Sequence, residues 1–369
     1  MKKRVLITVG GTGGHVYPAM ALAQQLKSKA EVLFVGGGLN SNRYFIRSAF
    51  THHEVSCGMI SPRRPLSSLA NLARILKGMQ QSSKIINSFN PDVVVGFGSY
   101  YTVPTLLAAK LRGVPIVLHE ANRIPGRVNR LLSQYVALTG VHFPDTVKLL
   151  KGKAQEISIP LREGYQLGAL SQEQSRGYFG LDLGRITLLV FGGSQGAQAI
   201  NQMVYEALKL LPALLSVDFQ VLHITGDAQS TIVLQKKYAD AGIHACVRDF
   251  ESRMDIAWQA ADFMISRAGA GTIAEELEFE VPGILIPFPE AMDNHQESNA
   301  DFMVDVVKGA VKFRQKDLDA KKLSQEIETF LGNQQKQIKE MQQAMRLYKE
   351  RTDARKLYEV ILEMINGQA

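Results

Sequence analysis

Two glycine-rich segments, each directly after an apolar run, have the composition of anion-binding turns. They are residues 10–14 (GGTGG) and residues 192–196 (GGSQG), and a stretch of helical period follows each of them. Glycines let a backbone approach an anion closely, and the N–H groups at a helix start favour negative charge. Each segment therefore predicts a turn that binds a phosphate group. The alternative is a tight strand-to-helix turn that binds nothing, and the repetition at equivalent places weighs against it.

Neither segment matches a nucleotide-binding fingerprint. A G-x-G-x-x-G pattern that starts at Gly11 fails at Val16, and neither segment contains G-K-[ST]. An acidic residue should also follow the second strand of a dinucleotide-binding unit, whereas residues 32–35 lead into three glycines. NAD chemistry and NTP hydrolysis are therefore disfavoured.

Apolar, β-branched runs alternate with helix-like stretches almost throughout the chain. This alternation is typical of parallel sheets that are covered by helices on both faces. The pattern of strand, glycine pair and helix starts again at residue 186, which predicts a second domain of the same kind. The runs are residues 5–9, 32–35, 93–97 and 116–119 in the first half, and residues 186–191, 219–225, 263–265 and 284–288 in the second.

We therefore expect the α/β fold class, with two doubly wound, Rossmann-like domains. The first domain should cover residues 1–163 and the second residues 164–340, with a polar linker around residues 160–175. A helical tail should cover residues 341–369, and packing back on the first domain is one option for it. Ligands of open α/β sheets bind beyond the carboxyl ends of the strands, so both glycine segments should face a cleft between the domains.

The composition is that of a basic globular protein. The 369 residues carry a net charge of +7, which suits nucleic acid, an anionic membrane or a phosphate-rich substrate. Nucleic acid ranks last, because there is no Lys/Arg-rich block and no zinc-finger or RNP motif. The chain shows no signal peptide and no run of about 18 apolar residues. The distant Cys57 and Cys246 fit a reducing cytosol and argue against disulfides or structural zinc.

Six segments in one order resemble the motifs of the MurG family of N-acetylglucosaminyltransferases. Together they extend over most of the chain, and the ordered set is specific. The segments are residues 10–18 (GGTGGHVYP), 91–100 (PDVVVGFGSY), 119–122 (HEAN), 192–197 (GGSQGA), 267–275 (RAGAGTIAE) and 287–300 (PFPEAMDNHQESNA).

The resemblance implies the two-domain glycosyltransferase-B fold and an inverting transfer of N-acetylglucosamine. It implies UDP-N-acetylglucosamine as donor and undecaprenyl-diphosphate-linked muramoyl-pentapeptide as acceptor, the step from lipid I to lipid II in peptidoglycan synthesis. We expect no cofactor and no metal. The D-x-D match at Asp317 and Asp319 is better interpreted as the acidic start of a helix. A metal-free route would use backbone amides and a cation, typically worth about 2.7–4 kcal/mol for each preorganised donor.

Residue by residue, the resemblance places the donor site in the second half. Glu275 resembles the carboxylate that binds the ribose, Phe250 occupies the position beside the uracil, and Gln296 matches a glutamine that contacts the donor. The alternative for Arg267 and Glu275 is an exposed ion pair at a helix end, worth under about 1 kcal/mol. The other expected donor-site residues are Ser194, Arg267, and the turn of Ala270, Gly271, Thr272, Ile273 and Ala274.

His15 is the candidate general base, because an inverting displacement must deprotonate the acceptor hydroxyl. Imidazole titrates near neutral pH, and a positioned base typically contributes about 10²–10⁴-fold. The alternative is a histidine that caps the helix or binds phosphate. Pro18 should lie in the first turn of that helix, where its missing N–H costs nothing.

The resemblance assigns further residues to the acceptor side. Tyr100 resembles a family residue near the acceptor and is the second catalytic candidate, and Arg162 matches an interdomain arginine. For His119 and Glu120, a structural hydrogen bond and a catalytic role stay open. The residues expected to line the cleft from this side are Thr12, Gly13, Gly14 and Asn122.

The chain departs from the family pattern at three positions. Ala121 replaces a usual Gln, Ser99 replaces a Gly of G-G-Y, and Ile159 replaces an Asn before Pro160. The first two concern the acceptor side and the third concerns the alignment around Arg162.

A stretch after Arg63 and Arg64 could meet an anionic membrane. A basic rim beside an apolar helix face suits such a surface, and the alternative is a core-facing crossover helix. With a polyprenyl acceptor, we expect a peripheral protein on the cytoplasmic face of the bacterial inner membrane. The apolar residues at helical spacing are Leu66, Leu69, Leu72, Ile75, Leu76 and Met79, and Lys77 and Lys84 lie among or after them.

Two other functions stay open at the level of sequence. A UDP-N-acetylglucosamine 2-epimerase can share the fold, but it needs acidic residues for proton transfer and no lipid acceptor. A non-catalytic nucleotide-sugar-binding protein would also keep the donor motifs.

Overall fold

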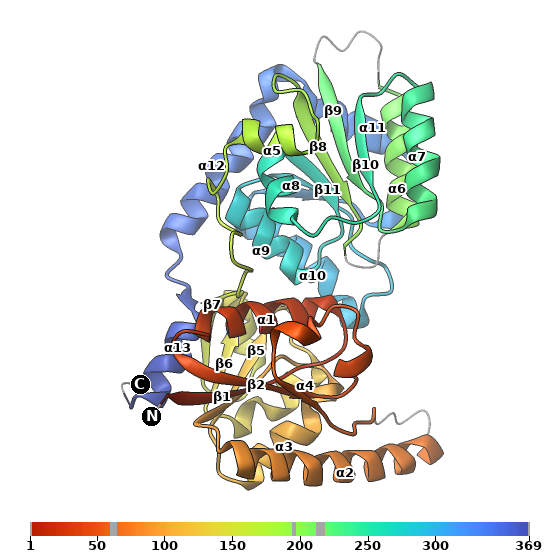
Figure 1. The fold of residues 1–369 in the computed structure, drawn as a ribbon. Helices are drawn as coiled ribbons and strands as arrows, with labels where there is room; N and C mark the ends of the chain where they lie inside the picture. The colour runs from red at the N-terminus through yellow and green to blue at the C-terminus, as the bar shows by residue number, and fades with distance from the viewer. Residues whose placement is uncertain (1, 60–64, 194–196, 212–217, 368–369) are drawn as a thin grey trace. The chain divides into compact units, whose positions relative to one another are not determined.

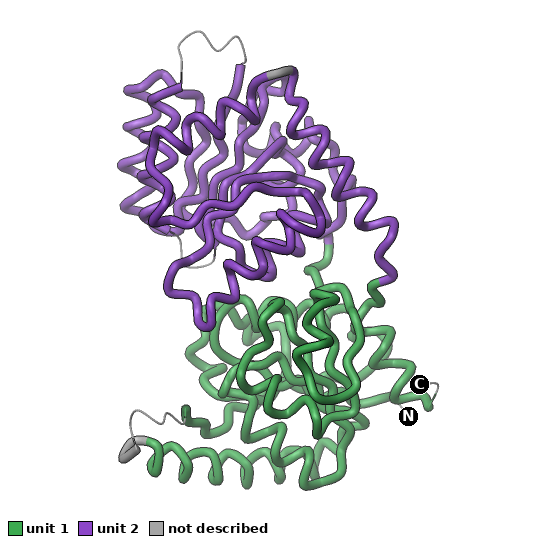
Figure 2. The backbone as a smooth tube through the Cα atoms, turned by 180° about the vertical axis from the view of Figure 1, so that it is seen from behind, with its two compact units in different colours: residues 1–163, 354–369 green, residues 164–353 purple. Residues whose placement is uncertain are grey.

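The computed structural model describes residues 2–59, 65–193, 197–211 and 218–367. The chain forms two compact units, which Figure 2 shows in two colours. Unit 1 is Met1–Glu163 with Ala354–Ala369, and unit 2 is Gly164–Asp353. Each unit contains one parallel sheet (Figure 1).

The sheet of unit 1 has the order β14-β7-β6-β5-β4-β1-β2-β3, and every pairing is parallel. Its central strands read as continuous apolar runs because both faces are buried. The strands are β1 (Lys3–Thr8), β2 (Ala30–Gly36), β3 (His52–Glu54), β4 (Val93–Gly96), β5 (Ile116–Glu120), β6 (Leu138–Val141), β7 (Ala154–Ser158) and β14 (Arg355–Lys356).

Helices cover both faces of this sheet. Val5 and Ile7 of β1 pack with α1 (Gly13–Leu26) and α13 (Leu357–Ile365) on one face. Leu6 packs on the other face, with α2 (Pro65–Phe89) and α3 (Val103–Leu111). The short helix α4 (Arg127–Leu132) follows β5. The C-terminal segment is therefore part of the core of unit 1.

The sheet of unit 2 has the order β10-β9-β8-β11-β12-β13, again with parallel pairings. The core on one face joins alternate residues of β8, such as Leu188 and Val190, to helices α6, α7 and α11. The strands are β8 (Ile186–Phe191), β9 (Phe219–Ile224), β10 (Ala245–Arg248), β11 (Phe263–Ser266), β12 (Gly283–Leu285) and β13 (Ala310–Lys312). The helices are α5 (Gln172–Tyr178), α6 (Gln198–Lys209), α7 (Ala228–Asp240), α8 (Met254–Ala260), α9 (Ala270–Phe279), α10 (His295–Asp301), α11 (Ala320–Leu331) and α12 (Lys336–Arg351).

In both sheets the first strand lies in the interior, and later strands are added first on one side of it and then on the other. β1 lies between β2 and β4, and β8 lies between β9 and β11. This is the doubly wound arrangement, in which ligands bind where the strand order reverses, outside the carboxyl ends of the strands. The α/β fold class with two doubly wound units is confirmed.

Local structure corrects two expectations. Pro18 does not lie in the first turn of its helix, because α1 begins at Gly13 and Pro18 falls inside it. The expected linker over residues 160–175 is too long at its end. Ser171 forms a capping box with Gln174 at the start of α5. The last part of the expected linker, residues 171–175, is therefore the start of this helix.

Candidate functional site

The first glycine turn connects β1 to α1 at the reversal point of unit 1. Gly11 has φ +90°, and a Cβ at Gly10 would lie 2.6 Å from Cβ of Tyr101, so only glycine fits at Gly10. Thr12 is the N-cap residue of α1, and Gly13 and Gly14 begin the helix. Thr12 and Gly14 are exposed. The first backbone N–H groups of α1 therefore open at the carboxyl edge of the sheet.

His15 is half-buried in the first turn of α1. A Cβ at Gly98 would lie 3.4 Å from Cε1 and 3.6 Å from Nδ1 of His15, so the imidazole lies against the turn after β4. The alternative in which His15 caps the helix is wrong, because Thr12 holds the N-cap position and its carbonyl accepts from the His15 N–H (3.1 Å).

His119 and Glu120 are the buried end of β5, beside this turn. Burial, together with nearby His142 and His15, lowers the pKa of His119 to about 3, so its imidazole is neutral. Burial raises the pKa of Glu120, and hydrogen bonds from the N–H groups of its neighbours offset only part of this rise. Oε1 of Glu120 accepts from the Asn122 N–H (2.9 Å), so Asn122 is fixed in the turn that follows β5.

Tyr100 stands after β4, next to the glycine turn. Its ring stacks on Tyr101 with a centroid distance of 4.1 Å. Burial, and then the hydrogen bond with Tyr101, raise the pKa of Tyr100, so the phenol keeps its proton and can donate a hydrogen bond. Ser99 before it has φ +68° and ψ +152°, a backbone conformation that suits glycine. The family's Gly at this position is explained by that geometry.

Arg162 follows β7 and reaches α1. Its guanidinium lies 5.1 Å from the ring centroid of Tyr17, and Tyr17 packs edge-on against Tyr44. A hollow of about 240 Å³ borders the glycine turn on the side of β2. It is lined by Gly11, Gly37, Gly38, Ser41, Asn42, Arg43, Tyr44 and Tyr101.

In unit 2 the expected donor residues follow strands whose carboxyl ends share one edge of the sheet. Ser194 follows β8 and lies outside the described residues. Arg267 follows β11, the residues from Ala270 begin α9, and Gln296 lies on α10 after β12. β8, β11 and β12 are adjacent, so these segments are neighbours at the reversal point.

The start of α9 presents a turn of backbone N–H groups. Gly269 is the N-cap and makes no side-chain cap bond, and Ala270, Gly271 and Thr272 form the first turn. Gly271 has open space where a Cβ would be. Unpaired N–H groups at a helix start are a site for phosphate. Ile273 and Ala274 are buried behind this turn.

Glu275 lies one turn into α9 and is held in place by an indole. Nε1 of Trp258 donates to Oε2 of Glu275 (2.7 Å), and Trp258 is fully buried. A carboxylate fixed in this way is preorganised to accept hydrogen bonds from hydroxyl groups.

Arg267 is buried, with 7% of its surface exposed. Its Nη1 donates to the carbonyls of Ile286 (3.1 Å) and Pro287 (3.2 Å), and its Nη2 donates to Oε1 of Gln315 (2.7 Å). The exposed ion pair with Glu275 is therefore the wrong interpretation of Arg267. Burial lowers the pKa of Arg267, as desolvation disfavours the charged form. The guanidinium ties the loop after β12 to the start of α9.

The same loop is fixed from α10. The Phe288 N–H donates to Oε1 of Gln296 (2.9 Å), and Nδ2 of the buried Asn299 donates to the Ala268 carbonyl (3.1 Å). Phe250 follows β10 and is 67% exposed, so its ring is accessible for stacking on a base.

The D-x-D match is a helix start. Asp319 is the N-cap of α11 and accepts from the Lys322 N–H (2.8 Å), which confirms the interpretation of this stretch. Among the described residues no group of His, Cys, Asp and Glu is placed to hold a metal.

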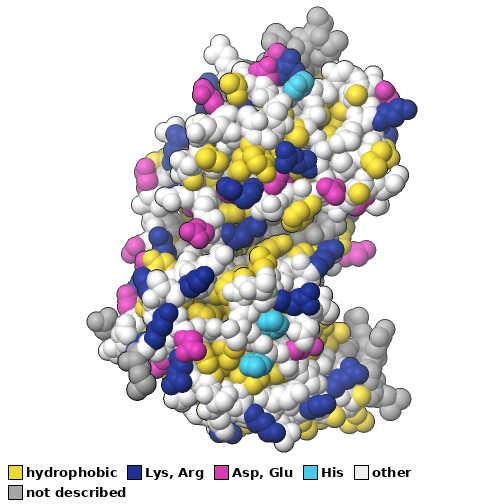
Figure 3. Space-filling model, in the orientation of Figure 1, with side chains coloured by type: hydrophobic (Ala, Val, Ile, Leu, Met, Phe, Trp, Pro, Cys, Tyr) yellow, Lys and Arg dark blue, Asp and Glu magenta, His cyan; other side chains and the backbone are white. Residues whose placement is uncertain are grey.

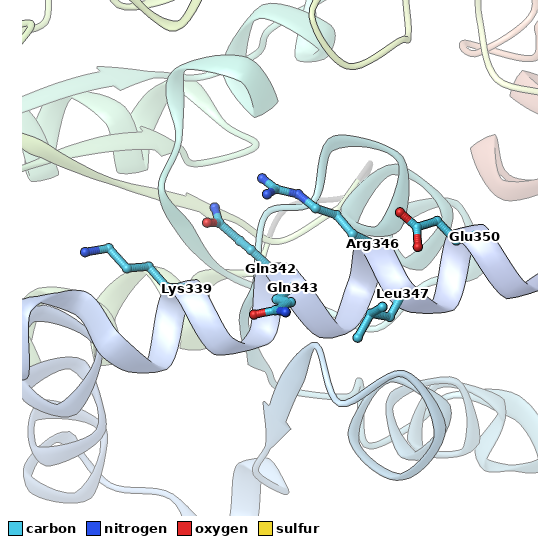
Figure 4. Close-up of a pocket in the computed structure, with 6 residues that line it drawn as sticks. All are labelled: Lys339, Gln342, Gln343, Arg346, Leu347 and Glu350. Carbon is cyan, nitrogen blue, oxygen red and sulfur yellow. The ribbon is translucent and has the colours of Figure 1, made fainter.

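A hollow of about 440 Å³ lies on α12, and Figure 4 shows its lining side chains. All of them come from this one helix, and the Arg346 side chain bonds to Glu280 (2.5 Å). This hollow brings no candidate donor or acceptor residues together.

The apolar stripe of α2 is divided between core and solvent. Ile75 and Ile86 are buried, whereas Leu69 is 68%, Leu72 44% and Leu76 57% exposed. Figure 3 shows apolar and basic side chains together at the lower edge of unit 1, where α2 runs in Figure 1. The core-facing interpretation is confirmed for Ile75, and the membrane interpretation stays a prediction. Arg63 and Arg64 lie outside the described residues, as does the side chain of Leu66. No helix in the described ranges is long and apolar enough to span a bilayer.

Three residues of these sites were not predicted from the sequence. They are Asn129 and Trp258, which hold Glu120 and Glu275, and Asn299, which holds the start of α9. The second Asn of the stretch that begins with HEAN was the available signal for Asn129. Asn299 lies in the motif at residues 287–300, and nothing in the sequence marked Trp258.

Two doubly wound α/β units, each with ligand-type turns at the reversal point of its sheet, define a glycosyltransferase of the GT-B type. A model of the glycosyltransferase family 28 N-terminal domain matches residues 5–141, and a model of its C-terminal domain matches residues 187–358. The chain belongs to this family, and within it to the MurG transferases.

The relatives agree with this placement. The UDP-N-acetylglucosamine–N-acetylmuramyl-(pentapeptide) pyrophosphoryl-undecaprenol N-acetylglucosamine transferase of Protochlamydia amoebophila (strain UWE25) is 52% identical over 85% of this chain and 83% of its own length. The protein of the same name from Chlamydia felis (strain Fe/C-56) is 34% identical over 99% and 100%. Both names describe transferases, so the epimerase alternative finds no support in them.

Solved structures give the same fold. The crystal structure of Acinetobacter baumannii MurG is 28% identical over 99% of both chains, with a TM-score of 0.78. Os79 from O. sativa in complex with UDP is 12% identical over 100% of both chains, with a TM-score of 0.71, and shows the fold alone.

Proposed function

We propose that this chain transfers N-acetylglucosamine from UDP-N-acetylglucosamine to undecaprenyl-diphospho-muramoyl-pentapeptide, with inversion at the sugar. Unit 2 binds the donor and unit 1 binds the acceptor. The observation that carries this proposal is the placement of the family motifs, because in each unit they follow the strands that flank the reversal point. The family names of the relatives support the substrates.

The donor is held by backbone N–H groups and by two side chains. The diphosphate lies at the first turn of α9, where Ala270, Gly271 and Thr272 present N–H groups. Glu275 accepts from the ribose, and Phe250 lies beside the uracil. UDP leaves with an additional negative charge, and donors aimed at that charge stabilise the transition state. Arg267 keeps the loop with Gln296 in place beside the turn.

The acceptor is activated by His15. Its imidazole takes the proton of the acceptor hydroxyl as the oxygen attacks the anomeric carbon, on the side opposite UDP. The bond from that carbon to the diphosphate oxygen breaks, and UDP takes the electron pair. Tyr100 keeps its proton and donates a hydrogen bond to the acceptor. Thr12, Gly13, Gly14, Asn122 and Arg162 line the acceptor side.

One assay separates this function from its rivals. Purified protein receives labelled UDP-N-acetylglucosamine with and without a lipid I analogue. We expect label in the lipid fraction only when the analogue is present. Isomerised sugar nucleotide would identify an epimerase, and binding without turnover would identify a binding protein.

We also infer that α2 meets the anionic surface of the membrane on the cytoplasmic face. Leu69, Leu72 and Leu76 recur at helical spacing and are exposed, and the cations Arg74 and Lys77 are exposed beside them. An apolar face with basic flanks inserts into anionic headgroups, and the acceptor is a polyprenyl lipid.

The membrane inference is tested with vesicles. Glutamate at Leu69 and Leu76 should lower binding to vesicles with anionic lipid, and so should charge reversal at Arg63 and Arg64. Ile232 of unit 2 is comparably exposed, at 64%, and Ile232→Glu serves as the control. Equal binding of all variants to the vesicles would show that α2 does not contact the membrane.

A further inference from the structure

The carboxamide of Asn129 is a buried group of unit 1 that the transfer reaction above does not use. Asn129 lies on α4 and is 2% exposed. Its Nδ2 donates to the backbone carbonyl of His119 (2.9 Å) and to Oε2 of Glu120 (3.0 Å). Its Oδ1 is buried without a hydrogen-bond partner among the described residues. A buried acceptor left unpaired costs about 1–3 kcal/mol, so this placement needs an explanation.

The orientation of the amide follows from its neighbours. In the reverse orientation Oδ1 would face a carbonyl and a carboxylate, and all three groups are acceptors. Nδ2 must therefore face His119 and Glu120, and Oδ1 is the atom that stays unpaired.

Glu120 is the anchor of this arrangement. Its Oε1 accepts from the Asn122 N–H (2.9 Å), and its Oε2 accepts from the Gly126 N–H (2.8 Å) and from Asn129. A carboxylate held by backbone donors on both oxygens does not turn. The amide of Asn129 is fixed by it in turn.

Gly98 places His15 beside the same amide. A Cβ at Gly98 would lie 3.5 Å from Nδ2 of Asn129 and 3.6 Å from Nδ1 of His15. The Nδ1 edge of the imidazole and Nδ2 of the amide therefore flank one point, and residue 98 has no side chain to separate them. Oδ1 belongs to the same amide group, and catalytic hydrogen bonds often tighten only when substrate is bound.

We propose that Asn129 is a positioning residue whose Oδ1 accepts a hydrogen bond from Nδ1–H of His15 during transfer. This inference rests on the proposed function. With the proton on Nδ1, Nε2 carries the lone pair that takes the acceptor proton. The resulting imidazolium keeps its Nδ1–H bond to Asn129, while the sugar bond forms and UDP leaves with its electron pair.

The charges around His15 make a neutral partner significant. His119 on β5 and His142 after β6 are neutral, because burial lowers their pKa values to about 3 and about 4. Tyr100 after β4 keeps its proton. Glu120 is behind Asn129 and is engaged by its own donors. An amide oxygen therefore orients His15 without adding a charge that would keep it protonated.

The decisive variants are Asn129→Asp and Asn129→Ala. A carboxylate at this position should favour imidazolium and shift the acidic limb of the kcat/KM profile upward by about 1–3 pH units. Alanine should lower kcat roughly tenfold or more, because the tautomer is no longer fixed, with KM for UDP-N-acetylglucosamine unchanged. An acidic limb of folded Asn129→Asp that coincides with that of the wild type would overturn the proposal.

Asn201→Ala is the matched control for loss of a buried asparagine. Asn201 is 3% exposed and both ends of its amide are paired, Nδ2 with the Thr225 carbonyl (2.9 Å) and Oδ1 with His223 (3.1 Å). We expect a lower melting temperature and an unshifted acidic limb for this variant.

A measurement on the wild type does not depend on how the variants fold. Long-range ¹H–¹⁵N spectra of the histidine-labelled protein report the tautomer of each ring, and His15→Gln assigns the signal. We expect Nδ1–H for His15, and Nε2–H would overturn the proposal. A wild type that transfers no sugar would instead reject the proposed function.

Discussion

The carboxyl edges of the two sheets present different chemical groups. At the edge of unit 1, titratable side chains gather, with His15, His119 and Glu120 beside one turn. At the edge of unit 2 the main feature is backbone N–H groups at the start of α9, and the nearby Arg267 and Glu275 are already held by protein partners. Under the function proposed above, the copy of the fold in unit 1 would carry out proton transfer and the copy in unit 2 would bind the anion.

The two helix starts follow different strands of their sheets. α1 follows the central strand β1, whereas α9 follows β11, the neighbour of the central strand β8. A site for base chemistry additionally needs buried partners that set charge and tautomer. The following predictions test that division, from the largest expected effect to the smallest.

His15→Ala should separate proton transfer from donor binding. We expect kcat to fall by about 10²–10⁴-fold, the usual contribution of a positioned base, with KM for UDP-N-acetylglucosamine unchanged. Steady-state assays with both substrates measure this. His223→Ala is the control, since His223 is a buried neutral histidine of unit 2 that bonds to Tyr238 (2.9 Å). Near-normal turnover of folded His15→Ala would show that His15 is not the general base.

Glu275→Ala should affect only the donor side. Loss of a hydrogen bond from a charged group costs about 1.5–3 kcal/mol, or roughly 10–100-fold in the Kd for UDP. Trp258→Phe keeps the carboxylate and removes its N–H donor, so a smaller loss in the same direction is expected. Isothermal titration with UDP measures both. Unchanged UDP binding by Glu275→Ala would contradict the assignment of Glu275 as the residue that binds the ribose.

Glu276 of unit 2 can be compared with Glu120 of unit 1, because both carboxyl groups are buried. Glu120 has donors on both oxygens, whereas Glu276 is fully buried and neither of its oxygens has a partner in the described ranges. Burial raises the pKa of Glu276 well above its ordinary value. Ionisation therefore favours the unfolded chain, and stability is lost as the pH rises above the unfolded pKa of about 4.3.

Glu276→Gln removes this titration. We expect a higher free energy of unfolding at neutral pH, by about 1–3 kcal/mol, and a flatter dependence on pH in urea denaturation. Glu280→Gln is the opposite control, because Glu280 is paired with Arg346 (2.5 Å) and Lys349 (3.2 Å). A loss of stability in Glu276→Gln at high pH would show that the carboxyl is satisfied.

Ser99→Gly tests strain in the turn of unit 1. Ser99 has a conformation that glycine adopts without cost, and such strain is worth about 1–3 kcal/mol. Since glycine also makes the unfolded chain more flexible, we expect a net gain of about 1 kcal/mol in thermal unfolding. Gly98→Ala should have the opposite sign, because Gly98 has φ +67°, a backbone conformation that is strained for a residue with a side chain. Destabilisation by Ser99→Gly would indicate instead that the hydroxyl group of Ser99 stabilises the turn.

The fold was predictable where strands are buried on both faces. The apolar runs at β1, β4, β8 and β11 mark strands because both faces need apolar side chains. Short strands that carry little buried surface gave no such signal. His52–Glu54, which forms β3 at the edge of the sheet, contains no apolar residue and pairs only because β2 offers a free edge.

The site was predictable where a backbone pattern repeats. Glycine spacing identified the first turn, since close packing such as that of Gly10 on Tyr101 leaves no other choice of residue. Residues 194–196 of the second segment lie outside the described residues. The supporting side chains were not predictable in this way. Asn129 and Trp258 reach Glu120 and Glu275 only through tertiary packing, which a single sequence does not encode as a spacing.

The last helix changes the order in which the chain can fold. α13 packs on α1, Lys3 donates to the Ile365 carbonyl (2.6 Å), and β14 pairs with β7. Unit 2 is one continuous stretch of residues, whereas unit 1 also needs residues 354–369, which follow unit 2 in the chain. Domains generally fold in order from the N-terminus, but unit 1 can complete its core only after unit 2 has been synthesised.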